Sequence, residues 1–379
     1  MANHKKHILL ATTGNTPQVL TETLYAIFQS GRPFPEEIYV ITTKSSVDVL
    51  LNGLFRDGRL QALVDEYQMP MPKFDESHIF LIEDARGEAV FDAKTAEDQT
   101  YIADFITRTV HQLTNDDSTA IHASLAGGRK TMAFYFGYAM SLYGREQDTL
   151  SHVFVDNHYE LVRDFWYPTK ETKWVAGRHG IGEVDLSQAS VTLAEIPFVR
   201  MRHSLDPTLV KSMTDLSFSQ TVAMLNASHQ SSLEVEMDCA TRTLRVVGIE
   251  ITLTAKEFAF YLWLVKKGQQ GLKVDRYFED DPSHSQAYLT LYQSLANDPR
   301  VFSSFGTTPE DFKEGQCEGL TGMGKEFLQP VCSSVNKKLK KALPSDIASK
   351  IGIGSESSSE GQRYGIAHEH TFNIVSHMD

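Results

Sequence analysis

The chain is poor in cysteine and in positive charge, and each shortage excludes a class of protein. Its three cysteines, Cys239, Cys317 and Cys332, have an odd count and no C-x-x-C spacing, so neither a zinc site nor a disulfide framework is predicted. Lysine and arginine total 36 against 49 acidic residues. The resulting net charge of -13 argues against a surface that is devoted as a whole to nucleic acid, although a local basic patch stays compatible with it.

Long apolar runs and metal-ligand motifs are also missing. No window approaches the roughly 18 consecutive apolar residues of a membrane span, and Ile8 to Ala11 is too short for the core of a signal peptide. We therefore expect a cytoplasmic protein. The 14 histidines show no H-E-x-x-H or other paired spacing, so we expect neither a metal nor another cofactor.

What the chain does contain is an alternation of strand-like and helix-like segments. Short apolar runs are followed by stretches of helical periodicity, and this order predicts right-handed crossovers and an α/β fold with a doubly wound, mostly parallel, Rossmann-like sheet. We expect this domain over residues 1–175, a connector over 176–212 and a second domain over 213–379. The aromatic segment 161–168 is expected to add edge strands or to pack on the sheet. The predicted strands are 7–13, 37–43, 79–82, 119–125 and 150–156.

Polar residues follow the first predicted strand in the order Thr12, Thr13, Gly14, Asn15 and Thr16, and Pro17 then opens a helix. The free N–H groups at a helix start, together with the helix dipole, favour an anion, and the hydroxyls can donate to phosphate or ribose oxygens. An ordinary polar turn with a threonine cap explains the segment equally well on its own.

A second polar turn follows the predicted strand 119–125. Its two glycines, Gly127 and Gly128, let the backbone approach a ligand closely. Arg129 and Lys130 then open a helix at its positive end, where cations are unfavourable unless an anion offsets them. This conflict favours a phosphate site over a basic pair at a helix start. The glycines are adjacent, so the P-loop spacing and ATP hydrolysis are not predicted.

These segments resemble a known family. ATTGNTPQVLTETL, the strand–AGGRKT–helix segment, FGYAMSLYGR and SHVFVD look like the CARF domain of CRISPR-associated proteins, in the branch that carries a winged helix-turn-helix. The resemblance implies a homodimer that binds a cyclic oligoadenylate, with cyclic tetra-adenylate expected, in a type III CRISPR antiviral system. By position, the residues implied in ligand binding are Thr12, Thr13, Gly14, Asn15, Thr16, Ser124, Gly127, Gly128, Arg129, Lys130 and Thr131.

Some CARF proteins also cleave their ligand without metal, as ring nucleases, and this resemblance implies the same chemistry here. A ribose 2′-OH attacks the adjacent phosphodiester, and the protein supplies in-line positioning and charge stabilisation. Lys130 or Arg129 would stabilise the transition-state charge, while Thr12, Thr13 or Ser124 would orient the 2′-OH. His122 is expected to be a packed core residue. The alternative is a non-catalytic, ligand-responsive regulator of transcription.

The second domain resembles the winged helix-turn-helix of OmpR-type regulators in its LTAKEF helix start, its basic helix and its terminal Arg363 to Ile366 segment. Thr254 is the expected N-cap, and residues 275–330 look like an insertion or a divergent helix pair. We expect strands at 363–366 and 371–375 to pair as a hairpin, which makes the R-x4-H spacing of Arg363 a coincidence rather than a ribonuclease motif. The candidate DNA-binding residues, which are equally explained as a solvated helix face, are Lys337, Lys338, Lys340 and Lys341.

Overall fold

A computed structural model describes residues 5–178, 182–205, 216–358 and 361–375. The chain divides into two compact units, Met1–Leu205 and Asp206–Asp379. Residues 176–205, which the sequence assigned to a connector, therefore lie in the first unit. Each unit has its own sheets and its own core.

The first unit is built on a six-stranded sheet with the order β3-β2-β1-β4-β5-β8. The five strands that the sequence predicted pair in parallel, and the edge strand β8 runs antiparallel to β5. The sheet is therefore largely parallel, as expected. The strands are β1 (Lys6–Thr12), β2 (Glu37–Thr42), β3 (Ile79–Leu81), β4 (Thr119–Ser124), β5 (Thr149–Val155) and β8 (Val191–Glu195).

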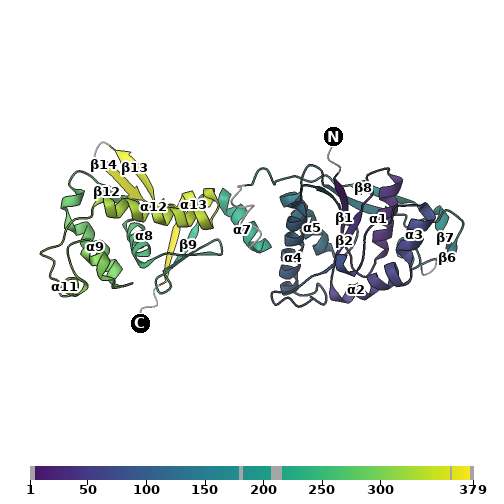
Figure 1. The fold of residues 1–379 in the computed structure, drawn as a ribbon, viewed down its shortest axis with the longest axis horizontal. Helices are drawn as coiled ribbons and strands as arrows, with labels where there is room; N and C mark the ends of the chain where they lie inside the picture. The colour runs from purple at the N-terminus through teal and green to yellow at the C-terminus, as the bar shows by residue number, and fades with distance from the viewer. Residues whose placement is uncertain (1–4, 179–181, 206–215, 359–360, 376–379) are drawn as a thin grey trace. The chain divides into compact units, whose positions relative to one another are not determined.

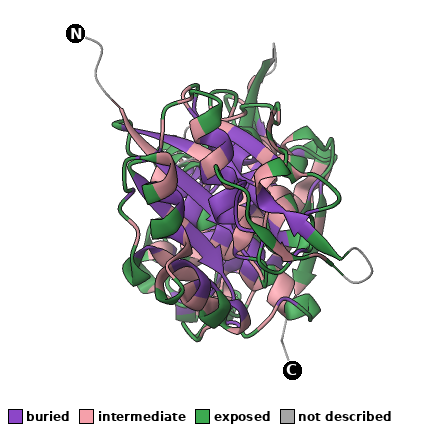
Figure 2. Ribbon diagram, turned by 90° about the vertical axis from the view of Figure 1, so that its right-hand side faces the viewer, coloured by how far each residue is buried: buried purple, intermediate pink, exposed green. Residues whose placement is uncertain are grey.

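Helices cover both faces of this sheet, with α1 and α3 on one side and α4 and α5 on the other (Figure 1). Each helix turns an apolar stripe to the sheet: in α1, Leu20, Leu24 and Ile27 repeat at helical spacing and are fully buried. Buried residues follow the strands, and exposed residues lie on the outer helix faces (Figure 2). The helices are α1 (Gln18–Gln29), α2 (Lys44–Leu51), α3 (Arg59–Tyr67), α4 (Ala96–Thr114) and α5 (Lys130–Tyr143).

The aromatic segment 161–168 forms no strand and packs instead. Trp166 and Tyr167 join the core between the sheet, α1 and α3, where their large apolar surfaces are removed from water. The added strands come later in the chain. They are a small hairpin of β6 (Trp174–Ala176) and β7 (Glu183–Asp185), and β8, whose five residues are too few for the periodicity to stand out.

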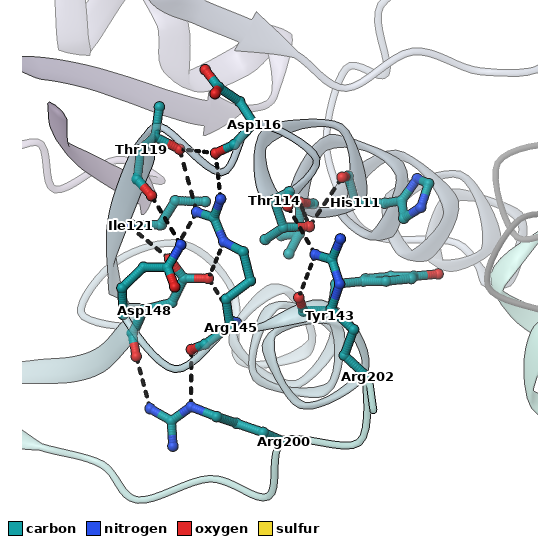
Figure 3. Close-up of polar contacts among 12 residues, drawn as sticks. His111, Thr114, Asp116, Thr119, Ile121, Tyr143, Arg145, Asp148, Arg200 and Arg202 are labelled. Atoms are coloured by element: carbon teal, nitrogen blue, oxygen red, sulfur yellow. Dashed lines mark hydrogen bonds and ion pairs between the residues drawn. The ribbon is translucent and has the colours of Figure 1, made fainter. Parts of the chain in front are cut away.

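A buried ion pair closes the amino-terminal edge of the sheet (Figure 3). Asp148 is fully buried, and its carboxylate accepts bonds from the Ile121 N–H and from the backbone and side chain of Arg145 at 2.8–2.9 Å. Arg200 donates to the carbonyls of Arg145 and Asp148, and Arg202 to those of Thr114 and Tyr143. The network thus ties the last segment of the first unit to the helices and strands beneath it.

The second unit contains a four-stranded sheet, β11-β10-β9-β15, and a three-stranded sheet, β12-β14-β13. The expected terminal hairpin is wrong: β14 pairs with β13 and β12, whereas β15 runs parallel to β9 in the other sheet. The strands are β9 (Glu234–Asp238), β10 (Thr243–Val246), β11 (Ile249–Thr252), β12 (Leu272–Val274), β13 (Gly354–Ser358), β14 (Gly361–Gly365) and β15 (Thr371–Val375).

Helices fill the rest of the second unit, and the expected capping box of Thr254 and Glu257 starts α8. Residues 275–330 fold around an aromatic cluster that includes Tyr288, Phe302 and Phe305, so this stretch belongs to the unit's core. The basic helix α12 begins at Lys325 and accommodates Pro330. The helices are α7 (Phe218–His229), α8 (Ala255–Lys267), α9 (Pro282–Gln293), α10 (Pro299–Ser303), α11 (Pro309–Lys313), α12 (Lys325–Ala342) and α13 (Ser345–Ile351).

Within the described ranges, no helix has both the length and the apolar character that crossing a membrane requires.

Replacing Asp148 by Asn should lower the free energy of unfolding of the first unit by about 3–5 kcal/mol, because Arg145 is left as a buried charge without its counter-ion. The measurement is urea unfolding of the full chain in a Trp263→Phe background. The two remaining tryptophans, Trp166 and Trp174, then both report on the first unit. The control is Asp117→Asn, at an exposed site in the loop between α4 and β4, which should lower the free energy of unfolding by less than about 0.5 kcal/mol. Equal effects of the two changes would contradict the role given to the ion pair.

Candidate functional site

The strand order places a topological switch point between β1 and β4. From β1 the chain proceeds outward through β2 and β3, and it then returns to the other side of β1 to form β4 and β5. In open α/β sheets, the connections that leave such a point from the carboxyl ends of the strands diverge and leave a crevice. The two polar turns of the sequence, after β1 and after β4, are the turns that flank this crevice.

The two turns are in direct contact. The Thr12 hydroxyl donates a hydrogen bond of 2.8 Å to the Gly127 carbonyl. A Cβ added to Gly14 would lie 3.4 Å from the Gly128 Cα, and one added to Gly127 would lie 2.4 Å from the Thr12 carbonyl oxygen. Gly128 has a φ of +84°, which L side chains rarely adopt. Glycine at the second turn, as Gly127 and Gly128, is therefore what permits the two backbones to meet.

Two clefts open beside this contact. The larger, of about 340 Å³, is lined by residues of both turns, of α1, of β5 and of the segment after β5. The smaller, of about 200 Å³, lies toward the start of α2 and is lined in part by Thr13, Asp92 and Arg129. Gly14, Asn15 and Gly128 line both clefts, so the two clefts lie on either side of the glycine contact.

Three helices start at this edge of the sheet: α1, α2 and α5. None of the three has a side-chain cap hydrogen bond, and none has an acidic residue in its first turn. The first two N–H groups of α2 donate to the Val90 and Phe91 carbonyls. It is therefore at α1 and α5 that the first N–H groups and the positive end of the dipole are not neutralised from within the described chain. Combined with the clefts between the glycine turns, this arrangement favours an anionic ligand.

Two of the predicted residues, Thr12 and Ser124, are buried beneath the turns rather than lining the clefts. Thr12 is fully buried and holds the Gly127 carbonyl. Ser124 is 2% exposed, and its Oγ lies 3.3 Å from the Thr23 hydroxyl on α1. Neither residue lines a described cleft, so the structure gives both a place in holding the turns together.

Other predicted residues do line the clefts. Asn15, Thr16, Gly127 and Gly128 border the larger one. The amide oxygen of Asn15 accepts a 2.9 Å hydrogen bond from Ser46, which fixes the side chain and leaves its NH₂ group available. Thr13 borders the smaller cleft, and its buried hydroxyl has no hydrogen-bond partner among the described residues. Such a hydroxyl is a ready donor to a ligand.

Arg129 and Lys130 have different surroundings. The Arg129 guanidinium forms two hydrogen bonds with the Asp92 carboxylate, at 2.6 and 2.8 Å, and these bonds hold the pKa of Asp92 at about 2. Lys130 and Thr131 are exposed in the first turn of α5, and Lys130 has no ion-pair partner in the part of the chain that the structure describes. Lys130 is thus a cation at this edge that is free to meet an anion, as is the exposed Lys44 at the start of α2, which also has no ion-pair partner among the described residues.

Sequence reasoning did not find the carboxyl groups of the larger cleft. Glu22, on α1, is 8% exposed, and Glu160 follows β5. Burial and the nearby charge of Glu160 raise the pKa of Glu22 to about 8. The available signal was the position of Glu22 among Leu20, Thr21, Thr23 and Leu24, which are all buried in α1.

An aromatic surface of the larger cleft was also missed. Phe154 on β5 is 56% exposed, which is unusual for so large an apolar side chain, and it stacks on His152 with the ring centroids 4.6 Å apart. Both side chains line the cleft because residues two apart in a strand share one face. A flat aromatic surface beside an anion site is suited to stacking a nucleobase.

His122 lies away from both clefts. Its Nε2 is 2.7 Å from the Ser151 hydroxyl on the neighbouring strand, and burial lowers its pKa to about 4. It is therefore neutral near pH 7 and packed in the sheet, as expected. Across the described ranges no three histidine, cysteine or acidic side chains gather as metal ligands would.

The four lysines of α12 divide into two groups. Lys338 bonds to the Glu257 carboxylate at 2.6 Å and is partly buried, so it fastens α12 to α8. Lys337, Lys340 and Lys341 are exposed, while Val335, Leu339 and Leu343 turn into the core. The helix therefore presents a basic outer face, and the strands β13 and β14 come after it in the chain.

The first unit thus has a doubly wound, largely parallel α/β sheet with clefts at its switch point. Residues 16–230, more than half of the chain, match the family described as CRISPR-associated protein NE0113. The chain belongs to this family. A comparison with curated proteins finds no match.

Solved structures align with the chain at low similarity. A putative UDP-N-acetylglucosamine 2-epimerase from Listeria monocytogenes aligns over 39% of this chain and only 31% of its own, with 17% identity and a TM-score of 0.22. Protein VC1899 from Vibrio cholerae aligns over 95% of this chain and 75% of its own, with 11% identity and a TM-score of 0.22. Can2 from Sulfobacillus thermosulfidooxidans, in complex with cyclic tetra-adenylate, aligns over 96% of this chain and 75% of its own, with 10% identity and a TM-score of 0.21. At these TM-scores the alignments carry no argument about this chain.

Replacing Gly127 by Ala should force the two turns apart, because the new Cβ would meet the Thr12 carbonyl oxygen and the Thr13 Cα, which are both backbone atoms. We expect the free energy of unfolding of the first unit to fall by about 1–3 kcal/mol in urea denaturation. The control is Gly137→Ala within α5, where the nearest atom lies 4.0 Å away and the change should stabilise by about 0.5–1 kcal/mol. If Gly127→Ala also stabilises, the turns are not held in contact.

Proposed function

We propose that the first unit binds a cyclic oligoadenylate of a type III CRISPR system and cleaves it slowly without metal, which ends the antiviral signal. The observation that carries the proposal is the meeting of two glycine turns at the switch point, flanked by uncapped helix starts and the clefts between them. Membership of a CRISPR-associated family supplies the biological setting.

The chemistry of the clefts fits the repeating unit of such a ring. A phosphate would meet the N–H groups at the start of α5 and the Lys130 ammonium, and a ribose would meet the Thr13 hydroxyl or the Asn15 amide. An adenine would stack on Phe154. Each part of a nucleotide therefore has a counterpart of matching chemistry around Gly14 and Gly128.

The size of the site supports a dimer. Ligand pockets that enclose a whole drug-sized molecule span about 300–1,000 Å³, so a cleft of about 340 Å³ has room for one nucleotide unit rather than for a whole ring. A ring of identical units is symmetric, and a second copy of the chain related by a two-fold axis would supply identical contacts to its other half. We therefore place the ligand across a homodimer.

The ring-binding proposal is tested with pure protein, radiolabelled cyclic tetra-adenylate and cyclic hexa-adenylate. Cyclic tetra-adenylate, the ring that the resemblance of the sequence implies, is tested first. Dissociation constants are measured by calorimetry, and products are identified by mass after long single-turnover incubation in EDTA. The proposal expects binding, and products with a 2′,3′-cyclic phosphate and a 5′-hydroxyl end. If neither ring binds, the proposal fails. Binding without cleavage leaves a sensor.

Lys130→Ala should weaken binding by about 10- to 100-fold, because a charge-assisted contact to phosphate contributes about 1.5–3 kcal/mol. Arg108→Ala, which removes an exposed cation from α4 on the same face of the sheet, is the control and should leave the dissociation constant unchanged. Unchanged binding and turnover in Lys130→Ala would remove Lys130 from the site.

A second candidate function rests on α12. Its exposed Lys337, Lys340 and Lys341 precede the β13–β14 hairpin, and this order of a basic helix and a hairpin is that of a winged helix-turn-helix. In this alternative the protein is a ligand-responsive regulator of transcription that does not cleave the ring.

Gel shifts with the protein's own upstream DNA separate the two functions. Replacing Lys337, Lys340 and Lys341 together by Ala should abolish a specific shift and lower the salt dependence of binding by up to about three counterions. Lys313→Ala, an exposed lysine of α11, is the control. An unshifted operator, or a shift that the triple variant retains, would contradict DNA reading by α12.

A further inference from the structure

Glu22 is a buried carboxyl group that the anion site does not explain. It lies one helical turn after Val19, and both side chains line the larger cleft together with Gly127 and Gly128. Only 8% of the residue is exposed. Glu160 borders the same cleft from the segment after β5, is exposed to solvent, and acts on Glu22 by its charge.

The environment of Glu22 favours its neutral form. Its pKa is raised to about 8 first by burial and second by the charge of Glu160, and no hydrogen bond in the described structure compensates. The carboxyl group therefore keeps its proton at neutral pH, while the exposed Glu160 is the member of the pair that carries the negative charge. An apolar side chain would fill this buried position at a lower cost in desolvation free energy, so the presence of a carboxyl group favours a role in catalysis.

A protonated carboxyl group also removes a conflict within the site. Two carboxylates beside a phosphate would repel it, whereas one neutral and one ionised group offer a proton donor and a proton acceptor in the same cleft. This is the arrangement that acid–base cleavage of a phosphodiester needs, because one proton must leave the attacking hydroxyl and another must reach the departing oxygen.

We propose that Glu22 is the general acid and Glu160 the general base of ring cleavage; this inference rests on the ring-binding function proposed above. The 2′-oxygen attacks phosphorus as its proton passes to the Glu160 carboxylate. The bond between phosphorus and the 5′-oxygen breaks as that oxygen takes the proton of Glu22. The products are a 2′,3′-cyclic phosphate and a 5′-hydroxyl, and proton exchange with water restores the pair.

The other titratable side chain that lines this cleft is His152. Its Nδ1 lies 2.6 Å from the Val153 carbonyl oxygen, and its ring stacks on Phe154. These contacts commit His152 to forming the aromatic surface. Lys130 and Arg129 are the positive charges at the start of α5, and Arg129 already pairs with Asp92.

The test uses the full chain in single-turnover cleavage of the ring that it binds, measured from pH 5 to 10. The wild-type rate should fall above about pH 8, where Glu22 loses its proton. Glu22→Gln should bind the ring within about threefold of wild type, cleave it at least about 100-fold more slowly, and lose the decline above pH 8. Glu171→Gln, at an exposed site outside both clefts, should behave as wild type.

A sulfur substitution separates the two roles. In a ring whose 5′-bridging oxygens are replaced by sulfur, the leaving group is a thiolate, which departs without being protonated. This substrate should restore the rate of Glu22→Gln to near that of wild type, and it should not restore the rate of Glu160→Gln, which still lacks the base.

Each contrary result overturns a different claim. If no ring binds, the proposed function itself fails. If the ring binds and Glu22→Gln cleaves as fast as wild type, only the acid–base inference fails. If wild type binds the ring and does not cleave it, the cleavage part of the proposed function fails together with the acid–base inference, and a sensor remains. Equal losses on the oxygen and sulfur substrates would make Glu22 structural, and a pH profile that changes in His152→Gln instead would transfer the role to His152.

Discussion

The contact between two glycine turns is the constraint on which the site depends. The Thr12 hydroxyl holds the Gly127 carbonyl, and at Gly127 there is no room for a side chain because a Cβ would lie 2.4 Å from the Thr12 carbonyl oxygen. This contact fixes where α1 and α5 begin, because each helix starts a few residues after its turn. It thereby sets the position of the helix N–H groups and of Lys130, and it leaves the clefts on its two sides.

The sequence predicted the frame of the first unit because its signals are local. Apolar runs of strand length alternate with helical periodicity, and the carboxyl ends of parallel strands share one edge, so the convergence of the two turns follows from the order of elements. What could not be predicted depends on partners distant in the chain. Arg129 pairs with Asp92 from a loop between β3 and α4, and Thr12 and Ser124 turn inward, which residue type alone does not reveal.

Short elements and buried polar groups account for the other differences. The strand β8 has five residues and no clear alternation, so the sequence placed it in a connector. Arg200 and Arg202 attach the segment after β8 to the first unit, and their partners are backbone carbonyls, which carry no sequence signal. Glu22 was overlooked because a lone carboxylate in a helix is usually exposed.

Charge balance within the site decides how an acidic protein can hold an anion. Asp92, whose pKa is held at about 2, pairs with both Arg129 and Lys94, so these three side chains keep one net positive charge at neutral pH. Lys130 and the uncapped helix starts add to this attraction, and two carboxylates in the larger cleft would oppose it. Because burial keeps Glu22 neutral, the opposing charge is reduced to the solvent-exposed Glu160, which water screens. The burial that makes Glu22 a proton donor is therefore also what allows a phosphate to approach.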